Sequence, residues 1–220
     1  MAGGRGSRLG SITKNTPKPI IKINNKPYLE YLLKWLIKSG FKKFYFLLSY
    51  KNNKIEKFLE LFFQKKNLTY KVFIDKKRSG TFSAIYNHIK KLDQVFFYTN
   101  ADEISNFNIK KNFSKFKLSK TKVMCGLLKS RKGRYTIDKK RTSIKLGLRG
   151  NKQTYIDCGY KFINKEIFKQ VKKKYKKIED YIYGDYLKNN KNSYFLVKKK
   201  PLRIDTAFDI KRTKNELFKI

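Results

Sequence analysis

Several residue types are scarce in this 220-residue chain. It has two cysteines, Cys125 and Cys158, one histidine, and 16 acidic residues against 55 lysines and arginines. The two cysteines form no disulfide framework or metal-ligand spacing, and a single histidine excludes a histidine-dependent triad or a histidine-rich zinc site. No apolar run approaches the roughly 20 residues that cross a bilayer, and the opening MAGG has no apolar signal segment. We therefore expect a cytoplasmic protein without membrane insertion.

The charge is strongly one-sided, at +39. A basic surface attracts nucleic acid and anionic lipid without specificity. Here the lysines are spread along the whole chain instead of forming one arm, and charge alone specifies a partner weakly. We expect a solvated lysine-rich surface and no specific nucleic acid partner. A basic nucleic-acid-binding protein is the non-enzyme alternative.

Apolar runs alternate with amphipathic segments, the pattern of an α/β sheet. Hydrophobic residues make up 40% of the chain, enough for a substantial core. The absence of a repeat excludes a hexapeptide β-helix domain, so we expect one domain over residues 1–220. Helices are predicted between Pro27 and Gly40 and at 54–63, 83–92, 165–174, 179–189 and the C-terminus; strands at 44–48, 70–74, 95–98, 121–128, 155–163, 194–197 and 202–204; and a hairpin at 133–146.

Two short motifs near the N-terminus suit a phosphate ligand. Residues 3–9, GGRGSRL, form a glycine-rich turn whose backbone amides can converge on a phosphate. Lys18 then stands between Pro17 and Pro19, two residues of fixed φ, where it can act as a point charge. Either motif alone is also compatible with an ordinary turn.

The two motifs, with the run KPYLEYLL from Lys26 on, resemble the signature of the sugar-phosphate nucleotidyltransferase family. The branch they most resemble is the D-glycero-D-manno-heptose 1-phosphate guanylyltransferase type. The resemblance implies a doubly wound, mostly parallel, Rossmann-like sheet with helices on both faces. It also implies transfer of a nucleotidyl group from a nucleoside triphosphate to a sugar 1-phosphate, with release of pyrophosphate, for nucleotide-sugar and surface polysaccharide synthesis.

The resemblance extends along the chain and implies roles for particular residues. Mg²⁺ is the implied cofactor, and the nucleoside triphosphate and sugar 1-phosphate are the implied partners. The catalytic residues are Lys18 and Arg8; the nucleotide-binding residues are Ala2, Gly3, Gly4, Gly6, Ser7, Gly80 and Thr81; the sugar-phosphate residues are Asp157, Gly159, Glu179 and Lys152; and the metal ligands are Asp102 and Asp205. Asp102 and Asp205 each follow a short apolar run, where ligands of open α/β sheets are bound.

The chain departs from the family pattern at several points. The glycine of the family's N-G-D element is Ala101, and Ala207-Phe208 replaces the G-T after the second metal aspartate. The lysine that holds the sugar phosphate has no clear counterpart, with Lys145 and Lys152 as candidates. The apolar strand that precedes A-G-G in the family is absent, so we expect that the natural start lies upstream.

Three alternatives stay open besides the nucleic-acid-binding protein. The chain resembles cytidylyltransferases acting on phosphocholine in its opening motifs, and hexose 1-phosphate enzymes share them too. An inactive or shortened family member is the third. The preference for GTP rests only on the most similar branch, and a homo-oligomer is also left open.

Overall fold

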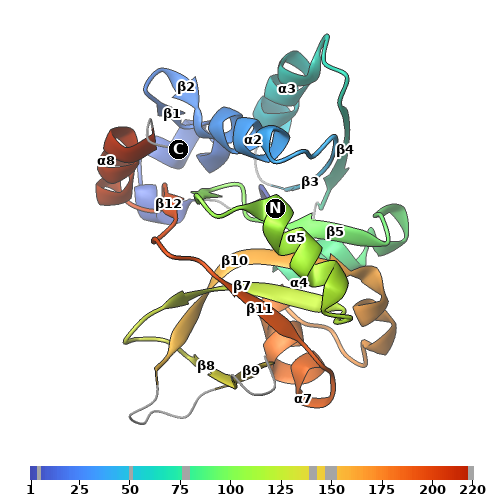
Figure 1. The fold of residues 1–220 in the computed structure, drawn as a ribbon. Coiled ribbons are helices and arrows are strands. Elements are labelled where there is room, and N and C mark those ends of the chain that lie inside the picture. The colour runs from blue at the N-terminus through green and yellow to red at the C-terminus, as the bar shows by residue number, and fades with distance from the viewer. Residues whose placement is uncertain (4–5, 50–51, 76–79, 139–142, 147–152, 218–220) are drawn as a thin grey trace. The chain divides into compact units, whose positions relative to one another are not determined.

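The computed structural model describes residues 1–3, 6–49, 52–75, 80–138, 143–146 and 153–217 (Figure 1). The chain forms two compact units, each with its own interior. The first unit comprises Met1–Arg78, Asn100–Asn106 and Pro201–Ile220, and the second comprises Ser79–Thr99 and Phe107–Lys200. Among the described residues, no helix is both long enough and apolar enough to span a membrane.

The first unit contains twelve short elements in its described part. They are η1 (Ser7–Leu9), α1 (Ile12–Asn15), η2 (Lys18–Ile20), β1 (Lys22–Ile23), β2 (Lys26–Pro27), α2 (Tyr28–Lys38), β3 (Lys43–Leu48), α3 (Asn52–Phe63), β4 (Thr69–Ile74), β6 (Glu103–Ile104), β12 (Leu202–Arg203) and α8 (Ala207–Glu216). β3 and β4 pair in parallel over their whole length, from Lys43 opposite Thr69 to Leu48 opposite Ile74. β1–β2 and β6–β12 are short antiparallel pairs.

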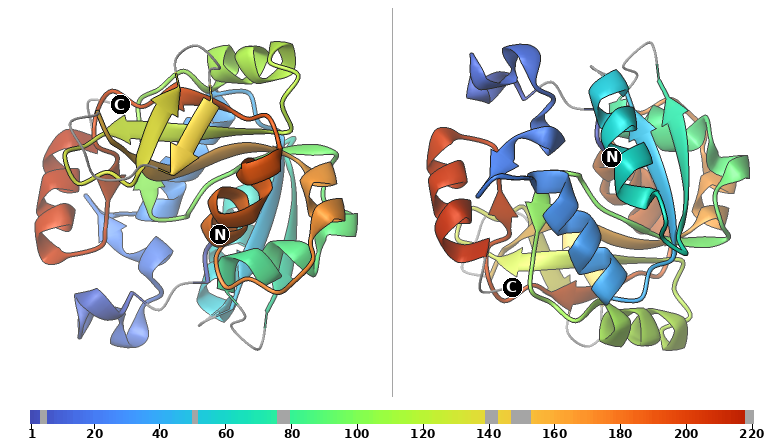
Figure 2. Two further views of the ribbon diagram at one scale, coloured as in Figure 1. Left: turned by 90° about the horizontal axis from the view of Figure 1, so that it is seen from below. Right: turned by 90° about the horizontal axis from the view of Figure 1, so that it is seen from above.

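Helix α3 lies beside the β3–β4 pair (Figure 2, right), and aromatic side chains pack it onto these strands. The Phe63 ring lies 5.4 Å from that of Phe44 and 4.6 Å from that of Tyr70, measured between centroids. Large aromatic rings bury much apolar area per residue, and offset or tilted pairs add attraction beyond that area. The helix is therefore fixed on the two strands that it connects.

The backbone of Met1 and Ala2 extends alongside β3. The Ala2 amide donates to the Leu47 carbonyl at 3.0 Å, and the Ala101 amide donates to the Met1 carbonyl at 2.8 Å. These bonds connect the start of the chain with β3 and with the segment that carries Asp102. In the described part of the first unit, no strand precedes η1.

The second unit is built around one six-stranded mixed sheet. Its elements are α4 (Gly80–Tyr86), η3 (Ile89–Lys91), β5 (Val95–Tyr98), α5 (Ile109–Leu118), β7 (Val123–Lys129), β8 (Tyr135–Asp138), β9 (Ser143–Leu146), β10 (Tyr155–Asn164), η4 (Lys165–Gln170), α6 (Ile178–Tyr181), the π-helical turn η5 (Ile182–Tyr186), α7 (Leu187–Asn189) and β11 (Ser193–Leu196). The strand order is β11-β7-β10-β8-β9, and β5 also pairs with β10. β11 runs parallel to β7, whereas β10 is antiparallel to β5, β7 and β8.

Long β10 is the centre of this sheet, as Figure 1 shows. Phe162 on β10 lies between α5 and β11: its ring centroid is 5.8 Å from that of Phe116 and 5.9 Å from that of Phe195. Most of β10 is buried. A polar side chain at a buried position of β10 therefore needs hydrogen-bond or ionic partners inside the protein.

The predicted α/β class and the hairpin within residues 133–146 are confirmed, the hairpin as the antiparallel pair β8–β9. One predicted helix is shorter than expected. Residues 165–170 form the 3-10 helix η4, and the chain from Val171 to Lys177 is not helical. This stretch begins with a β-branched valine and continues with consecutive lysines, and like charges spaced one turn apart disfavour a helix.

Candidate active site

The glycine-rich turn packs against Lys18 in the first unit. Gly6 has φ +67°, and its carbonyl accepts hydrogen bonds from the Leu9 amide at 2.9 Å and the Thr13 hydroxyl at 3.0 Å. A Cβ at Gly6 would lie 2.9 Å from Thr13 Cγ2 and 3.3 Å from Lys18 Cβ. Both the dihedral angle and the space therefore require glycine.

The other predicted residues of this turn have varied surroundings. Ala2 is buried, Ser7 and Arg8 are exposed, and the Gly3 carbonyl accepts a hydrogen bond from Ser49 Oγ at 2.7 Å. Gly4, also predicted to bind the nucleotide, lies outside the described residues.

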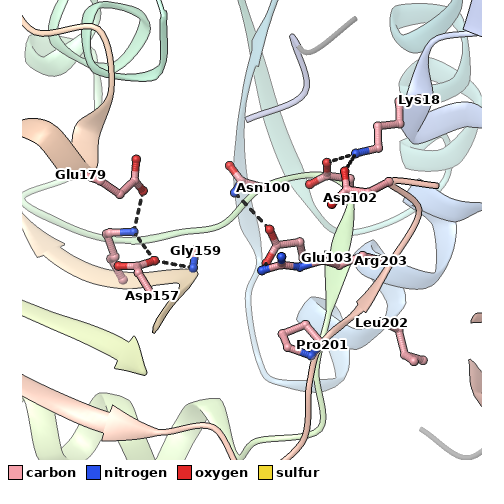
Figure 3. Close-up of polar contacts among 12 residues, drawn as sticks. Lys18, Asn100, Asp102, Glu103, Asp157, Gly159, Glu179, Pro201, Leu202 and Arg203 are labelled. Carbon is pink, nitrogen blue, oxygen red and sulfur yellow. Dashed lines mark hydrogen bonds and ion pairs between the residues drawn. The ribbon is translucent and has the colours of Figure 1, made fainter. Parts of the chain in front are cut away.

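Lys18 is the first residue of η2, directly after Pro17, whose φ of −63° starts the 3-10 turn. The side chain is almost buried, and Nζ contacts Oδ2 of Asp102 and Oδ1 of Asp205 (Figure 3). Asp102 lies 84 positions after Lys18 in the sequence and Asp205 lies 187 positions after it, and both contact the same ammonium group. The structure brings together three of the four charged residues that the sequence predicts for the catalytic and metal roles, Lys18, Asp102 and Asp205.

A two-residue antiparallel ladder places the two aspartates. Glu103 on β6 is opposite Arg203 on β12, and Arg203 Nη2 donates to Glu103 Oε2 at 3.1 Å. Asp102 directly precedes β6, and Asp205 follows β12 by two residues. Because the strands are antiparallel, the start of one and the end of the other lie at the same end of the ladder. The carboxylates therefore converge.

The charges at this cluster perturb each other. Burial lowers the pKa of Lys18, but the charge of Asp102 and hydrogen bonds to both carboxylates outweigh burial, so the net pKa is raised. For Asp205, burial raises the pKa, but the hydrogen bond and the charge of Lys18 lower it by more, so the net pKa is lowered. Arg8 also lowers the pKa of Asp205, which places its positive charge within range of the site.

The two carboxylates fit the ligand chemistry of Mg²⁺. Both contact a single cation, the Lys18 ammonium, and their side chains are 26% and 27% exposed. Magnesium is commonly bound through one or two carboxylates while it keeps waters and phosphate oxygens. Among the described residues, no group of three or more histidines, cysteines or acidic side chains is arranged to hold a metal. The remaining ligands would therefore come from water and the triphosphate.

The second unit contains a separate polar cluster centred on Lys161 of β10. Lys161 Nζ donates to Asp157 Oδ1 at 3.0 Å and to Glu179 Oε1 at 2.8 Å. The Gly159 amide donates to the same oxygen of Asp157, as Figure 3 shows. Asp157, Gly159 and Glu179, predicted from the sequence to contact the sugar phosphate, therefore lie together. Lys152 lies outside the described residues, as does the side chain of Lys145.

Gly80 and Thr81 make packing contacts within the second unit. Gly80 has φ +93°, and a Cβ there would lie 2.1 Å from the Lys176 carbonyl oxygen. The Thr81 hydroxyl accepts a hydrogen bond from the Ile178 amide at 3.0 Å. These contacts hold the start of α4 against the segment leading into α6. Their predicted contact with the nucleotide stays a prediction.

Sequence reasoning missed four polar residues at these clusters, Glu103, Arg203, Lys161 and Tyr183. Tyr183 donates its hydroxyl hydrogen to Asp157 Oδ2. A signal for Lys161 was present, because it interrupts the otherwise apolar run YKFI of a predicted strand. Glu103 and Arg203 have opposite charges next to the two predicted metal ligands, which was the available signal for their pairing.

Comparisons with known proteins show the family of this chain. The family model described as nucleotidyl transferase matches residues 1–135. The chain is 31% identical over 173 residues to the D-glycero-alpha-D-manno-heptose 1-phosphate guanylyltransferase of Campylobacter jejuni, with 76% of each chain covered. It is 28% identical over 116 residues to the protein of the same description from Aneurinibacillus thermoaerophilus, covering 52% of this chain and 50% of that protein.

Solved structures share the fold at lower identity. HddC from Yersinia pseudotuberculosis, in complex with GMP-PN, superposes with a TM-score of 0.78 at 23% identity, covering 98% of this chain and 96% of that one. A putative glucose-1-phosphate thymidylyltransferase from Bacillus anthracis gives a TM-score of 0.84 at 20% identity, covering 100% and 94%. These structures show the fold, and the family model over residues 1–135 with the 31% identical relative shows that the chain belongs to the nucleotidyl transferase family.

Proposed function

We propose that this protein transfers a nucleoside monophosphate from a nucleoside triphosphate, GTP first among them, to a heptose or hexose 1-phosphate. The product is a nucleotide sugar for surface polysaccharide synthesis, and pyrophosphate is released. The observation that carries the proposal is the convergence of Lys18, Asp102 and Asp205 beside the glycine-rich turn. The similarity to heptose 1-phosphate guanylyltransferases supports the choice of substrates.

The reaction needs positioning and charge neutralisation more than proton transfer. An oxygen of the sugar phosphate attacks the α-phosphorus, the new P–O bond forms, and the bond from that phosphorus to the bridging oxygen of the β-phosphate breaks. A phosphate monoester is already an anionic nucleophile, so no general base is required. Catalysis in such transfers comes from orientation and from preorganised positive charge.

Each residue of the first-unit site has a defined part in this scheme. The amides of the glycine-rich turn and the Arg8 guanidinium bind the triphosphate, and Lys18 neutralises charge at the transferring phosphate. Asp102 and Asp205 would hold Mg²⁺, which would supply charge neutralisation and orient phosphate oxygens. The Lys18 ammonium, which contacts both carboxylates, would then move to the phosphate.

We assign the polar cluster of the second unit to the sugar. Glu179 and Asp157 are hydrogen-bond acceptors when ionised, and sugar hydroxyls are donors. Gly159 has φ +76°, which places its amide toward the Asp157 carboxylate and shapes the strand around it.

Pyrophosphate release tests the proposal. Each of the four nucleoside triphosphates is combined with heptose, mannose, glucose and choline phosphates, with Mg²⁺ present or removed by chelation. We expect release only when a triphosphate, a sugar 1-phosphate and Mg²⁺ are all present, and fastest with GTP. Release with CTP and phosphocholine would instead identify the cytidylyltransferase alternative, and no release with any pair would refute the proposal.

A further inference from the structure

Lys161 is an exception among the many lysines of this chain. Its side chain is 0% exposed, and it lies on β10 between Tyr160 and Phe162, both buried. Removing an ammonium group from water is costly unless ionic partners and hydrogen bonds replace the water. A buried lysine does not contribute to solvation of the protein surface. Its effect is therefore on the carboxylates that it contacts.

A β-bulge gives Lys161 its first partner. Along the β10–β7 ladder, Asp157 is opposite Leu127 and Lys161 is opposite Cys125, so three residues of β10 face one residue of β7. A bulge bends a strand and redirects its side chains. Gly159 in this bulge has φ +76°, and its amide donates to Asp157 Oδ1, the oxygen that also contacts Lys161.

The contacts form a chain that ends at Glu179. Asp157 Oδ2 accepts from Tyr183, and the Tyr183 ring stacks on that of Tyr135 at 4.1 Å. Asp157 is therefore engaged at both oxygens and holds Lys161, which in turn holds Oε1 of Glu179 at 2.8 Å. Glu179 keeps 28% of its side chain exposed, whereas Asp157 keeps 10%. Glu179 is thus the member of the cluster that a ligand can reach.

The ionisation of the cluster is set by its charged and titratable neighbours. Burial lowers the pKa of Lys161, but the nearby carboxylates outweigh it and raise the pKa well above its ordinary value. For Glu179, burial raises the pKa, but Lys161 lowers it by more, so the net pKa is lowered. One positive and two negative charges leave a net charge of −1. Among the described residues, the groups that face Lys161 or its partners are Asp157 on β10, Glu179 on α6, Lys177 directly before α6, Cys125 on β7, Tyr98 on β5, Tyr183 on η5 and Tyr135 on β8.

We propose that Lys161 is a positioning residue for the sugar substrate, which holds the Glu179 carboxylate in one orientation as an acceptor for sugar hydroxyls. The inference rests on the proposed function, because it takes Glu179 as a sugar contact. Lys161 itself does not touch substrate, since its side chain is completely buried. It acts by presenting Glu179 ionised and with Oε1 already engaged.

Removal of the ammonium group has two expected consequences. In Lys161→Met, Glu179 loses the cation that lowers its pKa, whereas burial continues to raise it, so the pKa of Glu179 rises. We expect the KM for the sugar 1-phosphate to increase on the order of 10- to 100-fold, as when one partner of a buried charge pair is removed, while the KM for the triphosphate changes less than about twofold. We also expect this KM to be larger at pH 6 than at pH 8 in the variant, because protonation removes the acceptor, and to be flat in the wild type.

Two further variants separate positioning from a merely structural role. Lys161→Met combined with Asp157→Asn restores the net charge of −1, so the pH dependence should disappear even if the KM remains raised. This double variant also carries the test if Lys161→Met alone does not fold. Lys122→Met is the matched control, because Lys122 forms an exposed ion pair with Glu166 at 2.7 Å in the same unit; its kinetics should match the wild type.

The results distinguish the inference from the proposed function. If the wild type releases no pyrophosphate with any substrate pair, the inference and the proposed function are both refuted. If the wild type is active, the inference is overturned when a folded Lys161→Met has an unchanged, pH-independent KM for the sugar phosphate. It is also overturned when the KM for both substrates rises equally, or when the double variant keeps the pH dependence of the single one.

Discussion

Each unit of this protein places one lysine between two carboxylates, and the two arrangements differ in their exposure. Lys18 in the first unit bridges Asp102 and Asp205, each about a quarter exposed. Lys161 in the second unit bridges Asp157 and Glu179, and neither Lys161 nor most of Asp157 reaches solvent. The same ionic triad therefore occurs once with both carboxylates partly exposed, and once with the lysine and one carboxylate enclosed on a strand and only Glu179 partly exposed.

The backbone beneath each lysine differs as well. Lys18 starts the three-residue turn η2, whereas Lys161 belongs to a ten-residue strand paired on both sides. A lysine on a short element, with partners open to solvent, can give up its carboxylates to a metal and move to a phosphate. The Lys161 side chain, by contrast, is completely buried and reaches no solvent. The comparison indicates an exchangeable cation in the first unit and a permanent one in the second.

Stability should show the largest difference between the two lysines. Lys161→Met leaves the nearly buried Asp157 carboxylate without a cation, and loss of one partner of a buried pair typically costs about 3–5 kcal/mol. Lys18→Met should cost no more than about 1 kcal/mol, because water can solvate its partly exposed carboxylates. Urea unfolding of both variants measures this difference. Equal losses would remove the distinction between a permanent and an exchangeable cation.

Turnover should depend strongly on Lys18 and Asp102 of the first-unit site. Lys18→Ala and Asp102→Ala each remove one preorganised charge contact, and we expect turnover to fall by about 10²- to 10³-fold, on the order of 3 kcal/mol, with the fold intact. Lys34→Ala is the control, since Lys34 forms an exposed pair with Glu30 at 2.7 Å on α2 of the same unit. Steady-state pyrophosphate release, with circular dichroism of each variant, gives the result. Near-normal rates for Lys18→Ala would refute its assignment.

Magnesium without nucleotide should detect the competition between the two cations. In the wild type, the Lys18 ammonium contacts both proposed metal ligands, so we expect millimolar Mg²⁺ to raise the thermal midpoint little. Lys18→Met vacates that position, and Mg²⁺ should then stabilise the protein by on the order of 1 kcal/mol. Asp205→Asn added to this variant should abolish the effect. A shift that persists in the double variant would place the metal elsewhere.

The Glu103–Arg203 pair should have a smaller effect, transmitted through the backbone. These residues face each other on β6 and β12 and hold the segments that carry the two aspartates. A double-mutant cycle with Glu103→Gln and Arg203→Met should give a coupling energy of about 1 kcal/mol in stability. Zero coupling, with unchanged turnover in both single variants, would show that the ladder holds its register without this pair.

The smallest expected effect is on the free energy of unfolding at acid pH. The pKa of Asp205 is lowered from its ordinary value of 3.8, by Lys18 against the opposing effect of burial. A depressed carboxyl pKa adds stability that is present above the ordinary value and is lost as the pH falls through the folded value. The stability difference between the wild type and Lys18→Met should therefore shrink as the pH drops below 3.8. A constant difference from pH 5 to 3 would contradict this coupling.

The sequence predicted much of the first-unit site, because short motifs carry it. The turn at Gly6, the bracketed Lys18, and Asp102 and Asp205 could each be identified from local residues and from resemblance to a family. Their convergence depends on the β6–β12 ladder, whose strands are two residues long and about 100 residues apart in sequence. Such short strands have no periodicity to read, so the pairing of Glu103 with Arg203 was not predicted.

The second-unit cluster was less accessible to sequence reasoning. Asp157 and Glu179 were identified by resemblance, but no lysine was predicted between them; Lys145 and Lys152 were candidates for a different role, holding the sugar phosphate. A two-residue alternation read along β10 places Asp157 and Lys161 on the same face, but about 13 Å apart in a regular strand. The bulge at Gly159 shortens this separation and brings Lys161 Nζ within 3.0 Å of Asp157 Oδ1.

The most direct test is a crystal structure with Mg²⁺ and a non-hydrolysable analogue of the triphosphate that the release assay selects. We predict that Asp102 and Asp205 coordinate the metal, that Lys18 Nζ moves to a phosphate oxygen, and that Lys161 stays between Asp157 and Glu179. A structure in which Lys18 remains on the two aspartates while the triphosphate and the metal bind elsewhere would contradict the exchange of cations on which the proposed function depends.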